Sequence, residues 1–239
     1  MMMIAAQPNG GKSMFALWYA VMSGLPTFYF SADTDKRTTQ YRTAAIKTGL
    51  KFDEVKGMIG TSAESIIRDA LIEVTDAGLQ FDFNPQPNIR DIDMELMAYE
   101  EAYGVAPRLI ILDNLLNVAN DAGDFNGLVE IMGDLHALAR DKDAALIVLH
   151  HVNESTSKPE FPASRASIRG KVSQYPEQII SLAMIPQDNI MRVACVKHRH
   201  AQPSPSGEDY ETIFVDPERM AFYNTKVDLA NAAQRREWE

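Results

Sequence analysis

The sequence predicts an α/β domain with a mainly parallel central sheet that is flanked by helices. Short apolar runs of strand length alternate with longer stretches whose apolar residues recur at helical spacing, which is typical of this class. Near the C-terminus the apolar runs follow one another without long helices between them, which indicates antiparallel strands. A chain of 239 residues is long enough to bury one core of this kind.

The elements of this domain are justified in chain order by their residue patterns. The apolar runs predict strands at 1–6, 27–33, 79–83, 108–114, 145–151, 178–185, 191–198 and 211–216. The helical patterns lie at 12–24, 64–78, 89–104 and 125–143, and a further helix is expected to begin near Lys36. Two irregular segments, 117–126 and 152–171, directly follow predicted strands, and ligands of open α/β sheets gather at the carboxyl ends of strands.

Composition excludes several classes of protein. The net charge of -10 argues against a generally basic coat for nucleic acid, so any such contact is expected to be local. The sequence shows neither a basic leader, which would indicate a secreted protein, nor an apolar run of about 18 residues, which would indicate a membrane protein. The single cysteine, Cys195, forms no internal disulfide, and together these features predict a soluble, cytoplasmic protein.

The segment 6–13, AQPNGGKS, fits a relaxed phosphate-loop pattern that lies between a predicted strand and a predicted helix. Such a loop turns backbone N–H groups toward phosphate oxygens, while a lysine reaches the β- and γ-phosphates and a hydroxyl binds Mg²⁺. Alanine at position 6 matters only if that backbone needs a positive φ. The alternative is an ordinary glycine turn. The candidate nucleotide-binding residues are Gln7, Pro8, Asn9, Gly10, Gly11, Lys12 and Ser13.

Carboxylates at the ends of two predicted strands would complete an ATP site. Asp113 ends the run LIILD and is the candidate that binds Mg²⁺ together with Ser13, although a lone aspartate at a strand end is often only a turn residue. Asp33 and Asp35 follow another strand, and a carboxylate there can orient and deprotonate the attacking water. We favour Asp33, and the alternative is that both acids cap the following helix.

Five segments, in this order, carry a family resemblance: AAQPNGGKSMFAL, FYFSAD, LIILDNLL, LIVLHHVN and VKHRH. They resemble the RecA-like motor domain of DnaB-type replicative helicases, including those of plasmids and phages, from residue 1 to about 223. The resemblance implies a RecA-like P-loop NTPase fold, ATP and Mg²⁺ as cofactors, and a first loop position that accepts Ala6. We expect an ATPase core at 1–225 and a helical tail at 226–239.

The same resemblance assigns roles to further residues. Asp33 takes the place of the family's catalytic glutamate with a shorter side chain, and the polar sensor falls on His151 or, with a shift of one residue, on His150. The Lys-x-Arg pair that reaches the γ-phosphate of the neighbouring subunit falls on Lys197 and Arg199. The alternatives are a loop or metal role for the histidines and a solvated strand end for the basic pair.

DNA-binding loops are implied at 117–126 and 152–171. The first contains Asp121 and Asp124 but no lysine or arginine, so it departs from a phosphate-contacting loop. The second could also be a loop whose charges only face solvent. It carries the four candidate DNA contacts: Lys158, Arg165, Arg169 and Lys171.

The sequence therefore predicts an ATP-hydrolysing motor that acts on single-stranded DNA, without the family's N-terminal domain and linker helix. We expect a phage-type replicative helicase that forms a homo-oligomer, either a hexameric ring or a filament, with a separate loader or primase. One alternative is a single-strand annealing or recombination ATPase. Another is an ATP-dependent DNA-binding switch in which slow hydrolysis acts as a timer.

Overall fold

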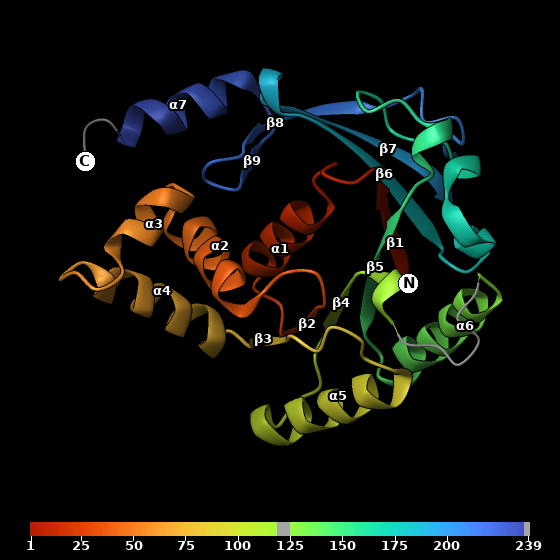
Figure 1. The fold of residues 1–239 in the computed structure, drawn as a ribbon, viewed down its shortest axis with the longest axis horizontal. Helices are drawn as coiled ribbons and strands as arrows, with labels where there is room; N and C mark the ends of the chain where they lie inside the picture. Colours follow the sequence, from red (N-terminus) through yellow and green to blue (C-terminus); the bar gives the residue numbers. More distant parts are fainter. Residues whose placement is uncertain (119–124, 237–239) are drawn as a thin grey trace.

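One mixed sheet forms the centre of the molecule (Figure 1). The computed structural model describes residues 1–118 and 125–236, except the side chains of 125–126, 169–171 and 233–236. Within these residues nine strands lie in the order β3-β2-β4-β5-β1-β6-β7-β8-β9. Pairing is parallel from β3 to β6 and antiparallel from β6 to β9. The strands are β1 (Met2–Ala6), β2 (Thr27–Ser31), β3 (Leu79–Asp82), β4 (Leu109–Asp113), β5 (Ala145–His151), β6 (Gln178–Ile185), β7 (Ile190–His198), β8 (Glu211–Asp216) and β9 (Ala221–Tyr223).

Helices cover both faces of the parallel part of the sheet. Helices α1 to α4 lie on one side, and α5 and α6 lie on the other (Figure 1). Helix α7 contacts β8 and β9. The helices are α1 (Lys12–Ser23), α2 (Lys36–Thr48), α3 (Phe52–Met58), α4 (Glu64–Asp76), α5 (Ile89–Tyr103), α6 (Phe125–Asp141) and α7 (Lys226–Arg236).

The predicted fold class is confirmed, including the antiparallel strands at the C-terminal end of the sheet. Helix α3 was not predicted, because it is short and Val55 is its one fully buried residue, which leaves no apolar periodicity to detect. The division at residue 225 stays a prediction. Among the described helices, none combines the length and apolarity needed to cross a membrane.

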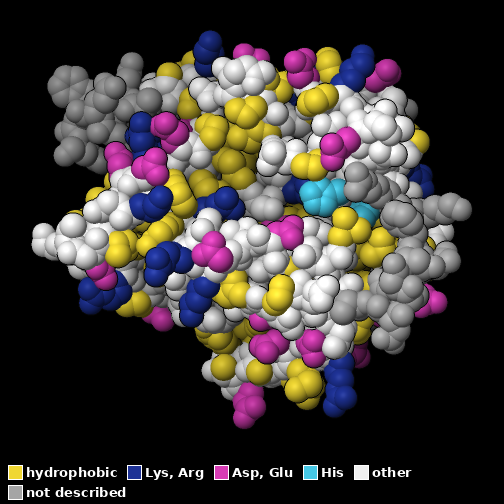
Figure 2. All heavy atoms as spheres, in the orientation of Figure 1, with side chains coloured by type: hydrophobic (Ala, Val, Ile, Leu, Met, Phe, Trp, Pro, Cys, Tyr) yellow, Lys and Arg dark blue, Asp and Glu magenta, His cyan; other side chains and the backbone are white. Residues whose placement is uncertain are grey.

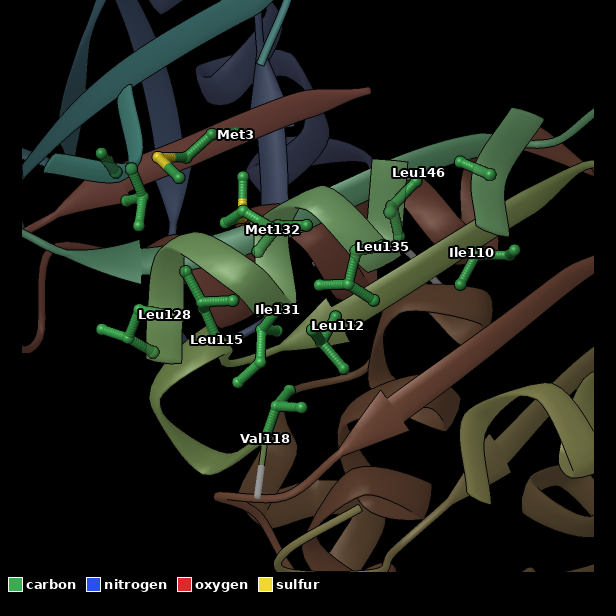
Figure 3. Packing of buried hydrophobic residues seen from close by; sticks show 14 of the residues in the cluster. Met3, Ile110, Leu112, Leu115, Val118, Leu128, Ile131, Met132, Leu135 and Leu146 are labelled. Atoms are coloured by element: carbon green, nitrogen blue, oxygen red, sulfur yellow. The ribbon is translucent and has the colours of Figure 1, made fainter. Parts of the chain in front are cut away.

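The core has two layers because the strands are buried on both faces. In β1, Met3 and Ala5 pack under α5 and α6, whereas Ile4 and Ala6 pack under α1, as alternation along a strand requires. Figure 3 shows the first layer, in which side chains of α6 lie against residues of β1, β4 and β5. The labelled α6 residues are Leu128, Ile131, Met132 and Leu135.

The parallel register brings the carboxyl ends of the central strands to one edge of the sheet. Ala6 of β1 lies beside His151 of β5, and Ser31 of β2 lies beside Asp113 of β4. Any polar residue that directly follows these strands therefore meets the others at this edge.

Candidate nucleotide site and basic pair

A cleft of about 710 Å³ opens at this edge of the sheet. Figure 2 shows hydrophobic side chains gathered on this side of the molecule, over the region of α1, β8 and β9. The cleft brings together nine residues that the sequence predicted for the site: Pro8, Asn9, Gly10, Gly11, Lys12, Ser13, Asp33, Asp113 and His151. Gln7 does not line it, because its side chain turns toward residue 157.

The loop between β1 and α1 has the backbone shape of an anion site. Asn9 (φ 59°) and Gly11 (φ 85°) adopt the left-handed conformation, whereas Ala6 is the last residue of β1 and is extended. A Cβ on Gly10 would lie 2.7 Å from the Ala6 Cβ, so glycine is required there. Gly11 is the N-cap of α1 and offers no side-chain cap, which leaves backbone N–H groups of the first turn available to phosphate oxygens. Alanine at position 6 is therefore compatible with the loop.

Lys12 is buried at the base of the cleft, with 6% of its surface exposed. Its Nζ donates to the carbonyl oxygens of Gln7 (3.2 Å) and Ala6 (3.4 Å), and lies 3.3 Å from His151 Nδ1. Burial lowers the Lys12 pKa to about 8, and the nearby Asp113 and Asp33 oppose that shift. A cation held this way is available to an incoming anion.

Asp113 is the buried carboxylate of the cleft, and 3% of its surface is exposed. Burial raises its pKa, while hydrogen bonds from Ser13 and Tyr29 act in the opposite direction. Tyr29 Oη donates to Asp113 Oδ2 at 2.9 Å. Burial, and then Asp113, raise the Tyr29 pKa well above its ordinary value, so its hydroxyl remains a donor. The sequence analysis missed Tyr29, because an aromatic residue in a buried strand looks like core.

The two carboxylates after β2 diverge. Asp33 lines the cleft, and its carboxylate accepts a hydrogen bond from the side-chain amide of Asn114, the residue after Asp113. Asp35 is the N-cap of α2, where it accepts from the Thr38 N–H at 3.0 Å, and hydrogen bonding with the Thr38 side chain and then its backbone lowers the Asp35 pKa. Asp35 does not line the cleft, which leaves Asp33 as the candidate base.

The two histidines that end β5 also diverge, because successive residues of a strand point to opposite faces. His150 is completely buried, whereas His151 is half-buried, lines the cleft and contacts Lys12. The geometry therefore favours His151 over His150 as the sensor candidate.

A further wall of the cleft comes from residues that no motif predicted. Helix α3 begins beside the turn between β8 and β9, since the Phe52 N–H donates to the Glu218 carbonyl at 2.8 Å. Lys51 Nζ forms an ion pair with Glu218 Oε2 at 2.7 Å. Pro217 and Met220 add apolar surface to this wall. The sequence carries no signal for this wall, because its two parts lie far apart in the chain.

Comparisons with known proteins show the family of this chain. The family described as DnaB-like helicase C terminal domain matches residues 1–163. The chain belongs to the DnaB-like helicase family. By family it is a replicative-helicase type of ATPase.

Two phage proteins resemble this DnaB-like chain along most of its length. The Gene 65 protein of Mycobacterium phage L5 is 30% identical over an alignment of 221 residues that covers 89% of this chain and 81% of that protein. The Gene 65 protein of Mycobacterium phage D29 is 32% identical over an alignment of 221 residues that covers 89% of this chain and 94% of that protein.

Solved structures share the RecA-like fold of the DnaB-like ATPase domain. One of them, described as an ATPase domain, matches with a TM-score of 0.79 and 18% identity over 94% of this chain and 84% of that chain. A DnaB-like replicative helicase, described with its interactions with primase, also matches with a TM-score of 0.79 and 18% identity. That match covers 95% of this chain and 57% of the helicase chain. The RadB recombinase matches at 0.58, with 11% identity, over 95% of this chain and 91% of that chain.

Lys197 and Arg199 are the basic pair that the DnaB-like resemblance directs toward the site of a neighbouring subunit. Both residues lie outside the chain's own cleft. Lys197 Nζ donates to the carbonyls of Ser173 and Gln174, each at 2.8 Å. Burial lowers the Lys197 pKa, and Arg165 and Arg199 add to that shift. Arg199 forms an ion pair with Glu177 at 3.3 Å, and about half of each side chain is exposed. Arg199 is thus on the surface, where a second subunit can reach it.

Of the four candidate DNA contacts of this DnaB-like chain, the structure describes the side chains of two. Lys158 and Arg165 are exposed on the segment that follows β5. The side chains of Arg169 and Lys171 lie outside the described residues, as do Asp121 and Asp124 in the first loop. The roles of all these residues stay predictions.

Proposed function

We propose that this chain is an ATP-hydrolysing motor that acts on single-stranded DNA as a phage-type replicative DNA helicase. The observation that carries the proposal is the meeting of the predicted phosphate loop, Asp33, Asp113 and His151 in one cleft of a DnaB-like chain. These side chains come from the ends of β1, β2, β4 and β5, and a parallel sheet gathers ligand-binding residues at that edge.

ATP binding follows from the charges of the cleft. The backbone N–H groups at the start of α1 and the Lys12 ammonium would bind the phosphates, in place of the contacts that Lys12 makes with the Ala6 and Gln7 carbonyls. The apolar wall of Pro217 and Met220 would receive the base.

The residues present fit a magnesium ion. Ser13 and Asp113 supply oxygen donors, which Mg²⁺ prefers, and they already share a hydrogen bond beside Lys12. Bound there with ATP, Mg²⁺ would neutralise charge on the β- and γ-phosphates.

Hydrolysis would use Asp33 as the base. Its carboxylate lines the cleft and is oriented by the side-chain amide of Asn114. A group that aligns and deprotonates water needs both this access and this fixed orientation. His151, in contact with Lys12, would respond to the γ-phosphate in this proposal.

Lys197 and Arg199 would complete the site of a neighbouring subunit by stabilising charge on the transferred phosphoryl group. Activity would then require a homo-oligomer, in our proposal a hexameric ring around single-stranded DNA that Lys158, Arg165, Arg169 and Lys171 contact. A separate loader or primase would act with it, since one of the similar structures is a DnaB-like helicase described with primase.

A strand-displacement assay on a forked duplex tests this function. The wild-type chain should separate the strands in the presence of ATP and Mg²⁺, and Lys12→Ala should lose both ATP turnover and unwinding. Annealing of complementary strands without unwinding would instead assign the chain to the recombination ATPases. ATP-dependent DNA binding with neither activity would indicate a switch, and turnover retained by Lys12→Ala would reject the cleft as the active site.

A further inference from the structure

The loop at residues 153–167, here called the strap, lies between the chain's own cleft and the segment that carries Arg199. Val152 and Ile168 form an antiparallel bridge at its base, and the Asn153 N–H donates to the Ser167 carbonyl at 2.8 Å. The strap is therefore a closed loop with a fixed base, and its contacts elsewhere decide what it can transmit.

Gln7 attaches one part of the strap to the phosphate loop. The side-chain Nε2 of Gln7 donates to the backbone carbonyl (2.9 Å) and the hydroxyl (2.7 Å) of Ser157. The backbone carbonyl of Gln7 accepts from Lys12 Nζ. A phosphate that binds Lys12 competes with that carbonyl. The Gln7–Ser157 contact thus joins the strap to the loop that carries Lys12.

Arg192 of β7 attaches another part of the strap. Its guanidinium lies over the rings of Phe161 (4.5 Å) and Tyr210 (5.1 Å), and its Nη1 donates to the Glu160 carbonyl at 2.7 Å. A planar cation that stacks on rings and donates at its edge is a task for arginine. Phe161 is 41% exposed, whereas the two residues that follow it are buried, so Arg192 supplies the specific contacts of the exposed part.

Beyond Arg192, the strap runs along residues 199–210, here called the β7–β8 connection, which begins with Arg199. The Arg165 N–H donates to the Pro205 carbonyl at 2.9 Å. Gly207 has a φ of 77°, and a Cβ on it would lie 2.6 Å from the Pro162 carbonyl oxygen. The two segments are therefore in direct backbone contact beyond the Arg192 side chain.

We propose that Arg192 is a positioning residue that couples the chain's own ATP site to the basic pair serving the neighbouring subunit. By clamping the strap to the β7–β8 connection, it makes nucleotide binding at Lys12 change the order of the segment that carries Arg199. This inference rests on the proposed function, because it takes the cleft as the nucleotide site and Arg199 as the trans-acting residue.

Hydrogen exchange with and without Mg²⁺ and a non-hydrolysable ATP analogue tests the coupling in the full chain. In the wild type, nucleotide should slow exchange in peptides covering 6–13, the strap and the β7–β8 connection. In Arg192→Ala the response at 6–13 should remain, and the response at the connection should fall about tenfold, within the range found for residues that carry coupling. Arg68→Ala, which removes an exposed arginine from α4, should behave as wild type.

ATP turnover gives a second readout that a merely structural role would not move. Arg192→Ala should lower kcat several-fold with little change in KM, because the phosphate loop is intact. Phe161→Leu removes the exposed ring under the guanidinium and should reproduce the effect if Arg192→Ala fails to fold. A full nucleotide response at the connection in both variants would overturn the coupling.

The outcomes separate this inference from the function on which it rests. Wild-type protein that responds at 6–13 but not at the connection would overturn the coupling alone. Wild-type protein with no response at 6–13 would reject the cleft as a nucleotide site, and the coupling with it.

Discussion

Lys12 is the buried cation of the cleft, and burial changes its pKa. It is buried beside two carboxylates and two backbone carbonyls, and burial holds its pKa at about 8. The unfolded chain keeps the ordinary value of 10.5, so it binds more protons than the folded chain between these two values. Stability should therefore rise with pH across this window. Bound phosphates have the opposite effect on Lys12, because they favour the ammonium.

Nucleotide binding is accordingly expected to take up a proton above pH 8. Affinity for an ATP analogue should fall by up to about tenfold for each pH unit above about 8, as the free protein loses the Lys12 proton. Titration calorimetry in two buffers of different ionisation enthalpy measures both the affinity and the proton uptake. Lys12→Arg is the control, since a guanidinium stays charged and should bind without proton uptake. An affinity that does not change with pH in the wild type would contradict the assignment.

At the scale of elements, the junction between β2 and α2 separates two acids that the sequence presents as a pair. The strand ends at Ser31 and the helix begins at Lys36, and the chain turns between them. Asp33 consequently faces the cleft, while Asp35 caps the helix through the Thr38 N–H. One acid is available for catalysis and the other for stability.

The same substitution at these two positions should therefore have different effects. Asp33→Asn should abolish ATP turnover with nucleotide binding retained, because the amide cannot accept the proton of the attacking water. Asp35→Asn should leave turnover unchanged, since asparagine is also a good cap, whereas Asp35→Ala should lower the denaturant midpoint because the helix loses its cap. Turnover assays and denaturant unfolding check the three variants. Equal turnover in Asp33→Asn and Asp35→Asn would remove Asp33 from the mechanism.

At the scale of the whole molecule, the candidate site is divided between two surfaces of the chain. The cleft contains the phosphate loop and Asp33, whereas Lys197 and Arg199 lie outside it, bound to Ser173, Gln174 and Glu177. If the basic pair acts in trans, a single chain has an incomplete site.

Mixing two inactive variants tests this division. A Lys12→Ala subunit should be unable to use its own cleft but still offers Arg199 to its neighbour. An Arg199→Ala subunit should still bind nucleotide but lacks the residue that its neighbour needs for hydrolysis. Random mixing in equal amounts pairs an intact cleft with an intact Arg199 at one interface in four, so about a quarter of the wild-type turnover should return. Mixed assemblies that form, by mass measurement, but stay inactive would contradict action in trans.

Local sequence patterns and long-range packing determine different parts of this molecule. Periodicity and turn residues are local, so the sequence alone determined the fold class, the order of the longer strands and helices, and the strand–loop–helix setting of Lys12. Only the tertiary structure decided which of Asp33 and Asp35 faces the cleft, and which of His150 and His151 contacts Lys12. The same is true of the contacts between residues far apart in the chain: Tyr29 with Asp113, Lys51 with Glu218, and Arg192 with Phe161 and Tyr210. These depend on how the sheet, its helices and its loops pack together, and no local pattern encodes that packing.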